Sequence, residues 1–313
     1  MNNQAAGLTV LVPVFNYDIE NLLKKLTCEK KLLPESGVRI IFLDDCSTDK
    51  EASDKNKHLV SSLGDKEVRY FVARKNGGRS KTRNKLIRLA KTDWILFLDA
   101  DVLPDRQDFL RHYLGTARNA SYDVVCGGTS YEQRLLPEPK FDFYFDLMKM
   151  ASNVTTETKN VEKWRYVLTS NIFAKRAVFQ VCKFDERFRT YGYEDQEWAI
   201  RVVRRYSLTH VENPVSHIGL QTREEFFKKM RISIPNYWLL GRIHPDIFNV
   251  TLLARLVYLL SFFPALFLKC IAGFSEFFCI NLSLPVRAVY WLYQLEKVTL
   301  LSVVAKMEKS RNK

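Results

Sequence analysis

The sequence predicts an α/β fold, in which a mixed but mostly parallel central sheet is flanked by helices and followed by an apolar, helical C-terminal appendage. In the first half of the chain, short apolar runs alternate with longer amphipathic segments, as strands joined by crossover helices do. Beyond residue 220 this alternation stops, and residues 251–304 carry only six charged side chains. With 313 residues, the chain can hold one large domain and an appendage. We therefore expect domains at 1–220 and 221–313.

Four apolar runs have the length and the aliphatic and aromatic content of buried strands. They are residues 8–15, 38–44, 67–73 and 93–99. Between them lie three segments with helical patterning, at residues 18–27, 49–63 and 79–91. Strands and helices in this order are typical of a parallel, nucleotide-binding sheet.

Each of these predicted strands ends in side chains that can bind a ligand. The ends are, in order, Phe15, the pair Asp44 and Asp45, the basic glycine-containing segment 74–78, and the pair Asp99 and Asp101. Ligands of open α/β sheets bind beyond the carboxyl ends of the strands. A simple turn explains one pair of acids, but four such ends in succession predict a single binding crevice.

The chemistry of these side chains suits a nucleoside diphosphate. The ring of Phe15 can stack on a base, Asp45 can accept a hydrogen bond from a pyrimidine imide N–H, and Asp99 can accept from ribose hydroxyls. Arg83 can neutralise a diphosphate. Asp101 can then hold a divalent cation whose other ligands are diphosphate oxygens and water, which is the mode typical of Mg²⁺ or Mn²⁺.

Six segments together resemble the family-two inverting glycosyltransferases. They are VPVFN at 12–16, DDCSTD at 44–49, KNGGRSKTRN at 75–84, DAD at 99–101, FDERF at 184–188 and GYEDQEWAIRV at 192–202. Any one of them occurs by chance, whereas six in this order and spacing are specific. The resemblance covers about residues 7–220 and implies the glycosyltransferase-A (GT-A) fold, a nucleotide-sugar donor and a catalytic function for the first domain. The family usually has glycine where this chain has Cys46, and a cysteine is tolerated there unless the turn requires a positive φ.

The resemblance also implies roles for individual residues. Asp45 matches the base-reading acid, Arg83 lies in a nucleotide-contacting segment, and Asp99 and Asp101 match the DxD pair that holds ribose and metal. Pro13 and Phe15 belong to the first segment and join the expected donor-nucleotide site.

Two adjacent acids, Glu194 and Asp195, precede an amphipathic segment of helical length. The helix dipole favours acids at such a position, so simple capping is an alternative explanation. By resemblance, Asp195 matches the catalytic base, which must take the proton of the acceptor hydroxyl as that oxygen attacks the donor sugar. Glu194 is expected to position or contact the acceptor, and an exchange of roles between the two acids stays open. His217 is a candidate additional metal ligand, with a purely structural role as the alternative.

The positive charge of the chain admits other functions. Lys and Arg exceed Asp and Glu by 13, which suits nucleotide diphosphates, nucleic acids or an acidic membrane. A nucleic-acid-binding protein is one alternative, but the basic residues are dispersed and no known motif is present, so we expect no nucleic-acid partner. A sugar-phosphate nucleotidyltransferase is another, but VPVFNYDIE lacks its glycine-rich, basic signature. We expect a metal-dependent inverting transfer from a UDP-sugar to a hydroxyl of a glycan or lipid-linked acceptor.

Cysteine usage and the apolar C-terminal region predict the location of the protein. The six cysteines show no zinc-like spacing and residues 1–7 lack a basic leader, so we expect a cytoplasmic protein. The uncharged run Leu256–Leu268 covers about 20 Å as a helix, against about 30 Å of membrane hydrocarbon, and Pro264 interrupts it. We therefore expect peripheral or monotopic association with the inner face of the cell membrane. A helical appendage packed on the first domain, or a dimer interface, is the alternative.

Overall fold

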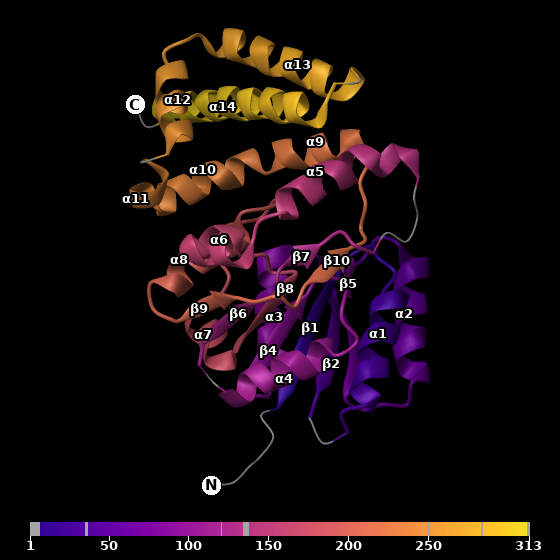
Figure 1. Cartoon of the computed structure of the whole chain (residues 1–313). Helices are drawn as coiled ribbons and strands as arrows, with labels where there is room; N and C mark the ends of the chain where they lie inside the picture. Colours follow the sequence, from indigo (N-terminus) through magenta and orange to yellow (C-terminus); the bar gives the residue numbers. More distant parts are fainter. Residues whose placement is uncertain are drawn as a thin grey trace. The chain divides into compact units, whose positions relative to one another are not determined.

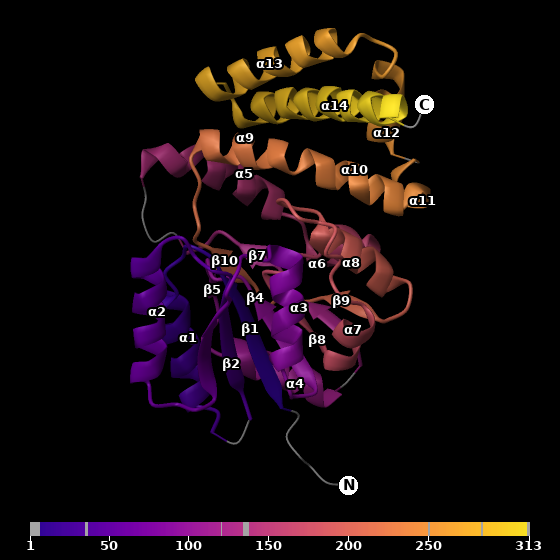
Figure 2. The same cartoon turned by 180° about the vertical axis from the view of Figure 1, so that it is seen from behind.

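The computed structural model describes residues 7–34, 37–119, 121–133, 138–249, 251–282 and 284–311 (Figures 1 and 2). Residues 1–6, which include most of the segment judged to lack a leader, lie outside this part. The chain forms two compact units. The first, called the sheet unit, comprises Met1–Leu136, Lys149–Arg187 and Glu194–Gly219, and the second, called the helical unit, comprises Pro137–Met148, Phe188–Tyr193 and Leu220–Lys313.

The sheet unit is built on a seven-stranded sheet with the order β3-β2-β1-β4-β8-β6-β9. The strands are β1 (Leu8–Val14), β2 (Arg39–Asp44), β3 (Val68–Val72), β4 (Trp94–Leu98), β6 (Val124–Cys126), β8 (Asn171–Lys175) and β9 (Leu208–His210). The strands β1 to β4 are parallel, β8 is antiparallel to β4 and β6, and β6 is parallel to β9. The four strands expected from the sequence are confirmed to within one residue at each end, and so is the mostly parallel sheet.

Helices cover both faces of this sheet (Figures 1 and 2). One face carries α1 (Glu20–Lys31), α2 (Lys50–Ser62) and α4 (Phe109–Asn119), and the other carries α3 (Arg79–Leu89), α7 (Arg176–Val181) and α8 (Glu194–Val203). Side chains of β1 alternate between the two cores, since Val10 and Val12 join the first and Leu11 joins the second. Burial on both faces explains why β1 and β4 are almost entirely apolar, whereas the edge strand β3 is partly exposed and carries Arg69.

A small second sheet, with the order β5-β10-β7, lies in the same unit. Its strands are β5 (Val102–Pro104), β7 (Thr129–Ser130) and β10 (Val215–His217). The antiparallel pairing of β10 with β5 places His217 opposite Val102. Because Val102 directly follows Asp101, this pairing brings His217 next to the second acid of the DxD motif.

The remaining elements connect the two units or form the helical unit. Those between β7 and β8 are η1 (Pro139–Phe141), α5 (Asp142–Ser152), α6 (Thr156–Val161) and η2 (Lys163–Tyr166). The C-terminal helices are α9 (Arg223–Ile232), α10 (Ile234–Ile243), α11 (Pro245–Phe248), α12 (Leu252–Leu260), α13 (Ala265–Asn281) and α14 (Val286–Arg311). Pro264 immediately precedes α13, so the apolar run around it is split between two helices. None of the described helices combines the length and apolarity needed to cross a membrane.

The helical unit is not limited to residues after 220. Phe143 lies 6.3 Å and 5.9 Å, between ring centroids, from Phe226 and Phe227 of α9. The ring of Tyr193 lies 4.8 Å from that of Tyr237 in α10. Because of such contacts, the segments Pro137–Met148 and Phe188–Tyr193 belong to the helical unit, which differs from the single boundary expected at residue 220.

Candidate active site

The exits of β1 and β2 are joined by hydrogen bonds around Asn16. The backbone N–H of Asn16 donates to the hydroxyl of Ser47 at 2.9 Å, and the N–H of Thr48 donates to the Asn16 side-chain oxygen at 2.8 Å. Asn16 adopts φ 50 to make these bonds. Pro13 is half-buried, and the neighbouring Phe15 ring is 48% exposed. This edge of the sheet therefore presents an aromatic surface on which a base can stack.

Asp45 holds the loop after β3 against the exit of β2. Its carboxylate accepts hydrogen bonds from the backbone N–H of Gly77, at 2.9 and 3.0 Å, and from that of Gly78, at 2.8 Å. The carboxylate is buried. Of its two oxygens, Oδ2 receives both amides and Oδ1 only one. A carboxylate oxygen can accept two bonds, so Oδ1 can still receive the imide N–H of a base.

Cys46 adopts φ 63, which lies in the left-handed region. A cysteine was expected to be tolerated at this position unless the turn requires a positive φ, and the turn does require one. A residue with a Cβ atom is strained there by about 1–2 kcal/mol, whereas glycine is not. The cysteine therefore costs stability that the usual glycine of the family would not.

Arg83 bridges two parts of the site from a buried position. Its Nη2 donates to Asp99 Oδ1 at 3.0 Å and its Nη1 to Glu194 Oε1 at 2.9 Å. The side chain is only 1% exposed. The expectation that Arg83 neutralises a diphosphate directly needs correction, because two carboxylates already share its charge and solvent does not reach it. Arg79, one turn earlier on α3, lies 3.8 Å from Glu194 and is 47% exposed, so its charge is accessible at the surface.

The same arginines set the ionisation of Asp99. Burial alone would raise the pKa of Asp99, but the charges of Arg83 and Arg79 outweigh it, and the pKa lies below its ordinary value. Asp99 is therefore a carboxylate at neutral pH and can accept hydrogen bonds from hydroxyl groups.

Asp101 and His217 form the second pair at this edge. Their Oδ2 and Nε2 atoms lie 3.4 Å apart, and the His217 ring stacks on Tyr131 with centroids 6.0 Å apart. Burial, and secondly the charge of Asp101, raises the pKa of Tyr17. A Cβ atom at Gly219 would lie 2.5 Å from Asp101 Oδ2. The sequence argument missed Gly219, although it follows His217 by two positions.

The protein atoms supply an incomplete set of metal ligands. Within the described residues, no group of three or more His, Cys, Asp or Glu side chains is arranged to hold a metal ion. Asp101 and His217 offer a carboxylate oxygen and an imidazole nitrogen close together, a combination compatible with Mn²⁺. Such a pair fits a cation that takes its other ligands from a diphosphate and water, and does not fit a cage made of protein alone.

Asp195 has the ionisation expected of a general base. Burial, and secondly the neighbouring charge of Glu194, raises the pKa of Asp195 to about 7, while the charge of Arg83 opposes this shift. The carboxylate accepts a hydrogen bond from the N–H of Gln196 at 2.9 Å. Glu194 is 2% exposed and bound to Arg83, which favours a positioning role for it over contact with an acceptor. The two acids therefore differ in environment, as residues with different roles do.

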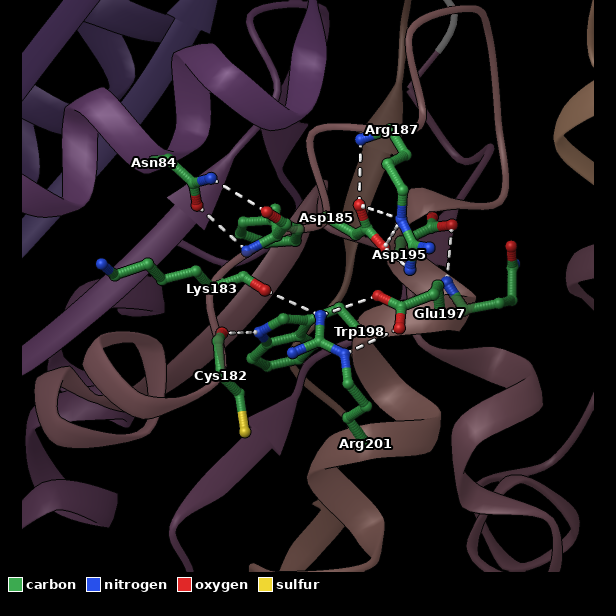
Figure 3. Close-up of polar contacts among 11 residues, drawn as sticks. Asn84, Cys182, Lys183, Asp185, Arg187, Asp195, Glu197, Trp198 and Arg201 are labelled. Carbon is green, nitrogen blue, oxygen red and sulfur yellow. Dashed lines mark hydrogen bonds and ion pairs between the residues drawn. The ribbon is translucent and has the colours of Figure 1, made fainter. Parts of the chain in front are cut away.

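Polar contacts of Trp198 and Arg201 hold the helix that carries Asp195 (Figure 3). Trp198 Nε1 donates to the carbonyl oxygen of Cys182 at 2.7 Å. Arg201 binds Glu197 with two contacts of 2.7 Å and donates to the carbonyl oxygen of Lys183 at 2.7 Å. Trp198 is fully buried, so it belongs to the core of the unit. These contacts anchor the part of α8 that follows Asp195 and Gln196.

Asn84 joins two of the motifs that carry the family resemblance (Figure 3). Its side-chain amide donates to the carbonyl oxygen of Phe184 at 2.9 Å and accepts from the N–H of Phe184 at 3.0 Å. Asp185 and Arg187, which follow, form an ion pair at 2.6 Å. The sequence argument quoted both segments but did not single out Asn84, because the two motifs are far apart in the chain.

Fold and site together define a class of protein. The mixed, mostly parallel sheet with acids at its carboxyl edge and helices on both faces agrees with the GT-A fold that the motifs imply. Residues 9–166, half of the chain, match the family described as Glycosyl transferase family 2. The chain therefore belongs to glycosyl transferase family 2, and the predicted family, GT-A fold and enzyme class are confirmed. This result favours a glycosyltransferase over the nucleotidyltransferase and nucleic-acid-binding alternatives.

Curated relatives share part of the sequence. The poly(ribitol-phosphate) beta-glucosyltransferase of Bacillus spizizenii is 29% identical over 122 residues, which are 38% of this chain and 18% of that protein. The uncharacterized glycosyltransferase YfnE of Bacillus subtilis is 24% identical over 239 residues, which are 62% of this chain and 59% of that protein. The matches thus span less than two thirds of either relative.

Solved structures share the fold. The crystal structure of S. aureus TarS 1-349 superposes with a TM-score of 0.52 and 17% identity, covering 98% of this chain and 92% of that chain. Its complex with UDP gives a TM-score of 0.51 and 16% identity, with the same coverage. At these identities, the likeness is one of fold.

Proposed function

We propose that the protein is a metal-dependent inverting glycosyltransferase that moves one sugar from a UDP-sugar to a hydroxyl of a glycan or lipid-linked acceptor, in polysaccharide or glycoconjugate synthesis. One observation carries the proposal. The buried Arg83 binds both Asp99, at the exit of β4, and Glu194, at the start of α8. This bridge, together with the raised pKa of Asp195, supports a role for Asp195 as the base next to the proposed donor site.

In the proposed reaction, the carboxylate of Asp195 takes the proton of the acceptor hydroxyl while the hydroxyl oxygen attacks C1 of the sugar. The bond between C1 and the diphosphate oxygen breaks, and its electron pair leaves with UDP. Attack on the face opposite the leaving group inverts the configuration at C1. A base with a pKa near neutrality is suited to this step, because it is partly ionised at working pH and still accepts a proton readily.

The other site residues bind the donor. Phe15 and Pro13 would contact the base, Asp45 its imide N–H, Asp99 the ribose hydroxyls and Arg79 the diphosphate. Asp101 and His217 would hold Mn²⁺ or Mg²⁺, and when bound the cation neutralises charge on the departing diphosphate as a Lewis acid. The 3.4 Å separation of their ligating atoms supports this assignment.

Named relatives support the substrate class. TarS 1-349 has been crystallised with UDP and with UDP-GlcNAc. The Bacillus spizizenii relative is named as a glucosyltransferase acting on poly(ribitol-phosphate). A UDP-sugar donor and a polymeric or lipid-linked hydroxyl acceptor are the corresponding proposals for this chain.

A donor screen tests the proposal. Purified protein is incubated with Mn²⁺ and a panel of nucleotide sugars, and the released nucleoside diphosphate is measured with and without EDTA. Asp195→Asn serves as the inactive control. Release from a UDP-sugar that depends on metal and on Asp195 supports the proposal, and the absence of release or binding across the whole panel contradicts it.

We further propose that the protein is cytoplasmic and rests on the inner face of the cell membrane through its helical unit. Large apolar side chains are exposed on α12, α13 and α14 and on the turn between α12 and α13. They include Leu252, Phe262, Leu266, Phe267, Phe274 and Trp291, each at least 50% exposed. Three exposed basic residues, Arg255, Lys269 and Arg287, lie on the same helices. Apolar and basic side chains together suit an anionic lipid surface better than a second copy of the same positively charged chain.

Vesicle binding tests the membrane proposal. Replacing Phe262, Leu266 and Phe267 together by serine should weaken co-sedimentation with phosphatidylglycerol vesicles about 10²-fold or more, because each buried apolar side chain contributes roughly 1.5 kcal/mol or more. Leu32→Ser is the matched control, since Leu32 is 68% exposed in the sheet unit. Unchanged sedimentation, or a dimer that the triple substitution dissociates, contradicts the proposal.

A further inference from the structure

The loop that leads into the catalytic helix has an unusual backbone. Gly192 and Tyr193, the two residues before Glu194, adopt φ 86 and φ 71. For a bulky side chain such as that of Tyr193, a positive φ is an outlier that costs about 1–2 kcal/mol. Such a conformation persists only where surrounding contacts hold it.

The segment Phe188–Tyr193 belongs to the helical unit, whereas the next residue, Glu194, begins the part of the sheet unit that contains Asp195. We propose that Asn236 and Lys297 of the helical unit hold this loop in its strained conformation and thereby position the catalytic base. The role of Asp195 as the base rests on the proposed function. The contacts that hold the loop do not depend on it.

Asn236, on α10, binds the backbone of the loop. Its Nδ2 lies 3.1, 3.4 and 2.9 Å from the carbonyl oxygens of Thr190, Tyr191 and Gly192. Asn236 is 4% exposed, so its amide is shielded from water, and hydrogen bonds of this kind contribute about 0.5–1.5 kcal/mol each. One buried amide therefore fixes three successive peptide groups just before the base.

Lys297, on α14, binds the last residue of the loop. Its Nζ donates to the hydroxyl of Tyr193 at 2.9 Å. The same ammonium lies 3.9 Å from the ring centroid of Tyr237 and 5.3 Å from that of Tyr193. Cation–π contacts of this kind contribute about 0.5–2 kcal/mol each. The lysine thus joins α14, α10 and the residue that precedes Glu194.

The contacts of Asn236 and Lys297 can affect the position of Asp195 because the loop that they hold continues directly into α8. Tyr193 and Glu194 share a peptide bond, so the orientation of the first turn of α8 depends on the backbone angles of Tyr193. A misplacement of a reacting group by about 1 Å can cost about 10² in rate without a change in donor binding. The donor-binding residues proposed above lie elsewhere, on the strand ends of the sheet unit and on α3.

Two substitutions separate this role from general stability. Lys297→Met keeps the aliphatic stem and removes the donor and the charge, and Tyr193→Phe keeps the ring and removes the hydroxyl. The matched control is Lys306→Met on the same helix, because the Lys306 Nζ donates to the carbonyl oxygen of Phe263 at 2.6 Å, at an exposed position away from the loop. We measure UDP affinity by calorimetry, kcat and KM for UDP-sugar turnover with water or acceptor, and hydrogen exchange of the peptide 188–197.

We expect Lys297→Met to lower kcat about 10-fold or more, to leave UDP affinity within about 2-fold, and to speed exchange in the peptide 188–197. The double variant with Tyr193→Phe should be no slower than Lys297→Met alone, because both remove the same contact. Lys306→Met should match the wild type in all three measurements. Exchange and kcat that equal those of Lys306→Met overturn the inference, and so does a parallel loss of kcat, UDP affinity and melting temperature. A wild type without any UDP-sugar turnover contradicts the proposed function instead, and the exchange data then still decide whether Lys297 holds the loop.

Discussion

Asp195→Asn is the substitution that tests the catalytic proposal most directly. Asparagine has nearly the same size as aspartate, and its side-chain oxygen can keep the 2.9 Å hydrogen bond from the N–H of Gln196. The change removes the proton acceptor and the negative charge. Loss of a positioned general base lowers the rate about 10²–10⁴-fold. We expect kcat to fall by that factor and the affinity for UDP to stay within about 2-fold, because the donor-binding groups are unchanged.

The pH dependence of turnover follows from the same carboxylate. Burial and the charge of Glu194 raise the pKa of Asp195 to about 7, and only the ionised form can accept a proton. The kcat of the wild type should therefore fall about 10-fold per pH unit below pH 7 and level off above it. The Asn variant, which has no such group, should show a flat profile over this range.

The raised pKa also has a consequence for stability. Between the ordinary pKa of 3.8 and the folded value of about 7, the folded chain binds a proton that the unfolded chain has lost. The free energy of unfolding of the wild type should therefore decrease as pH rises through this window and level off above pH 7. Since one pKa unit corresponds to about 1.4 kcal/mol, ionisation of Asp195 lowers the free energy of unfolding by at most about 4 kcal/mol. Coupling to the titration of Glu194 makes the decrease smaller. Asp195→Asn should thus melt at a higher temperature than the wild type at pH 8, and at nearly the same temperature at pH 4.

Glu194→Gln is the control for this prediction. Glu194 is bound to the buried Arg83 at 2.9 Å. Replacing Glu194 by neutral glutamine should destabilise the fold by about 3–5 kcal/mol, because the buried guanidinium then keeps only one of its two carboxylate partners, Asp99. Steady-state kinetics, UDP calorimetry and melting curves at both pH values distinguish the two variants. An Asn variant that turns over normally, together with an inactive but folded Glu194→Gln, would show that Glu194 is the base. Equal melting shifts for Asp195→Asn at pH 4 and pH 8 would refute the raised pKa.

Three further predictions concern other positions. Cys46→Gly should raise the free energy of unfolding by up to about 1 kcal/mol in urea titrations, because glycine relieves the strain at φ 63, although it also adds entropy to the unfolded chain. A destabilised variant would mean that the contacts of the Cys46 side chain contribute more than the strain costs. Asp101→Ala should weaken the affinity for UDP in Mn²⁺ to the level that the wild type shows in EDTA, as measured by calorimetry, and full affinity of the wild type in excess EDTA would exclude the metal assignment. Gly219→Ala should reproduce part of the Asp101→Ala defect, because the added methyl would lie 2.5 Å from Asp101 Oδ2; unchanged Mn²⁺ dependence would show that the carboxylate can shift without loss.

The first half of the fold was predictable from the sequence. The strands β1, β2 and β4 are buried on both faces, so each is a nearly continuous apolar run that differs sharply from the amphipathic helices around it. The strand β3 lies at the edge of the sheet and is partly exposed. The acids that follow β2 and β4 could also be placed at one edge, because the exits of parallel strands lie together. In the second half the strands are short, such as β6 and β9 with three residues each, and so short a run has no distinctive pattern.

The pairings within the site were decided only by tertiary structure. Arg83, Asp99, Asp101, Glu194, Asp195 and His217 were all singled out from the sequence. Their partners were not, since the Arg83 bridge to Glu194 and the approach of His217 to Asp101 each join distant parts of the chain. Arg83 consequently changed from a diphosphate ligand to a buried bridge, and the position of Cys46 proved to require a positive φ.

The physical reason for this division is the range of the interactions. The sequence by itself determined what depends on neighbouring residues, namely strand and helix periodicity, the residue types at strand ends and the order of the family motifs. Tertiary structure decided what depends on burial and on charges brought together from distant segments. Examples are the raised pKa of Asp195 and the role of Arg83. Further examples are the need for glycine at position 219 beside Asp101 and the contacts of Asn236 and Lys297 with the loop before Glu194. Burial changes the cost of a charge and the strength of its pairing by several kcal/mol, and neither can be calculated before the packing is known.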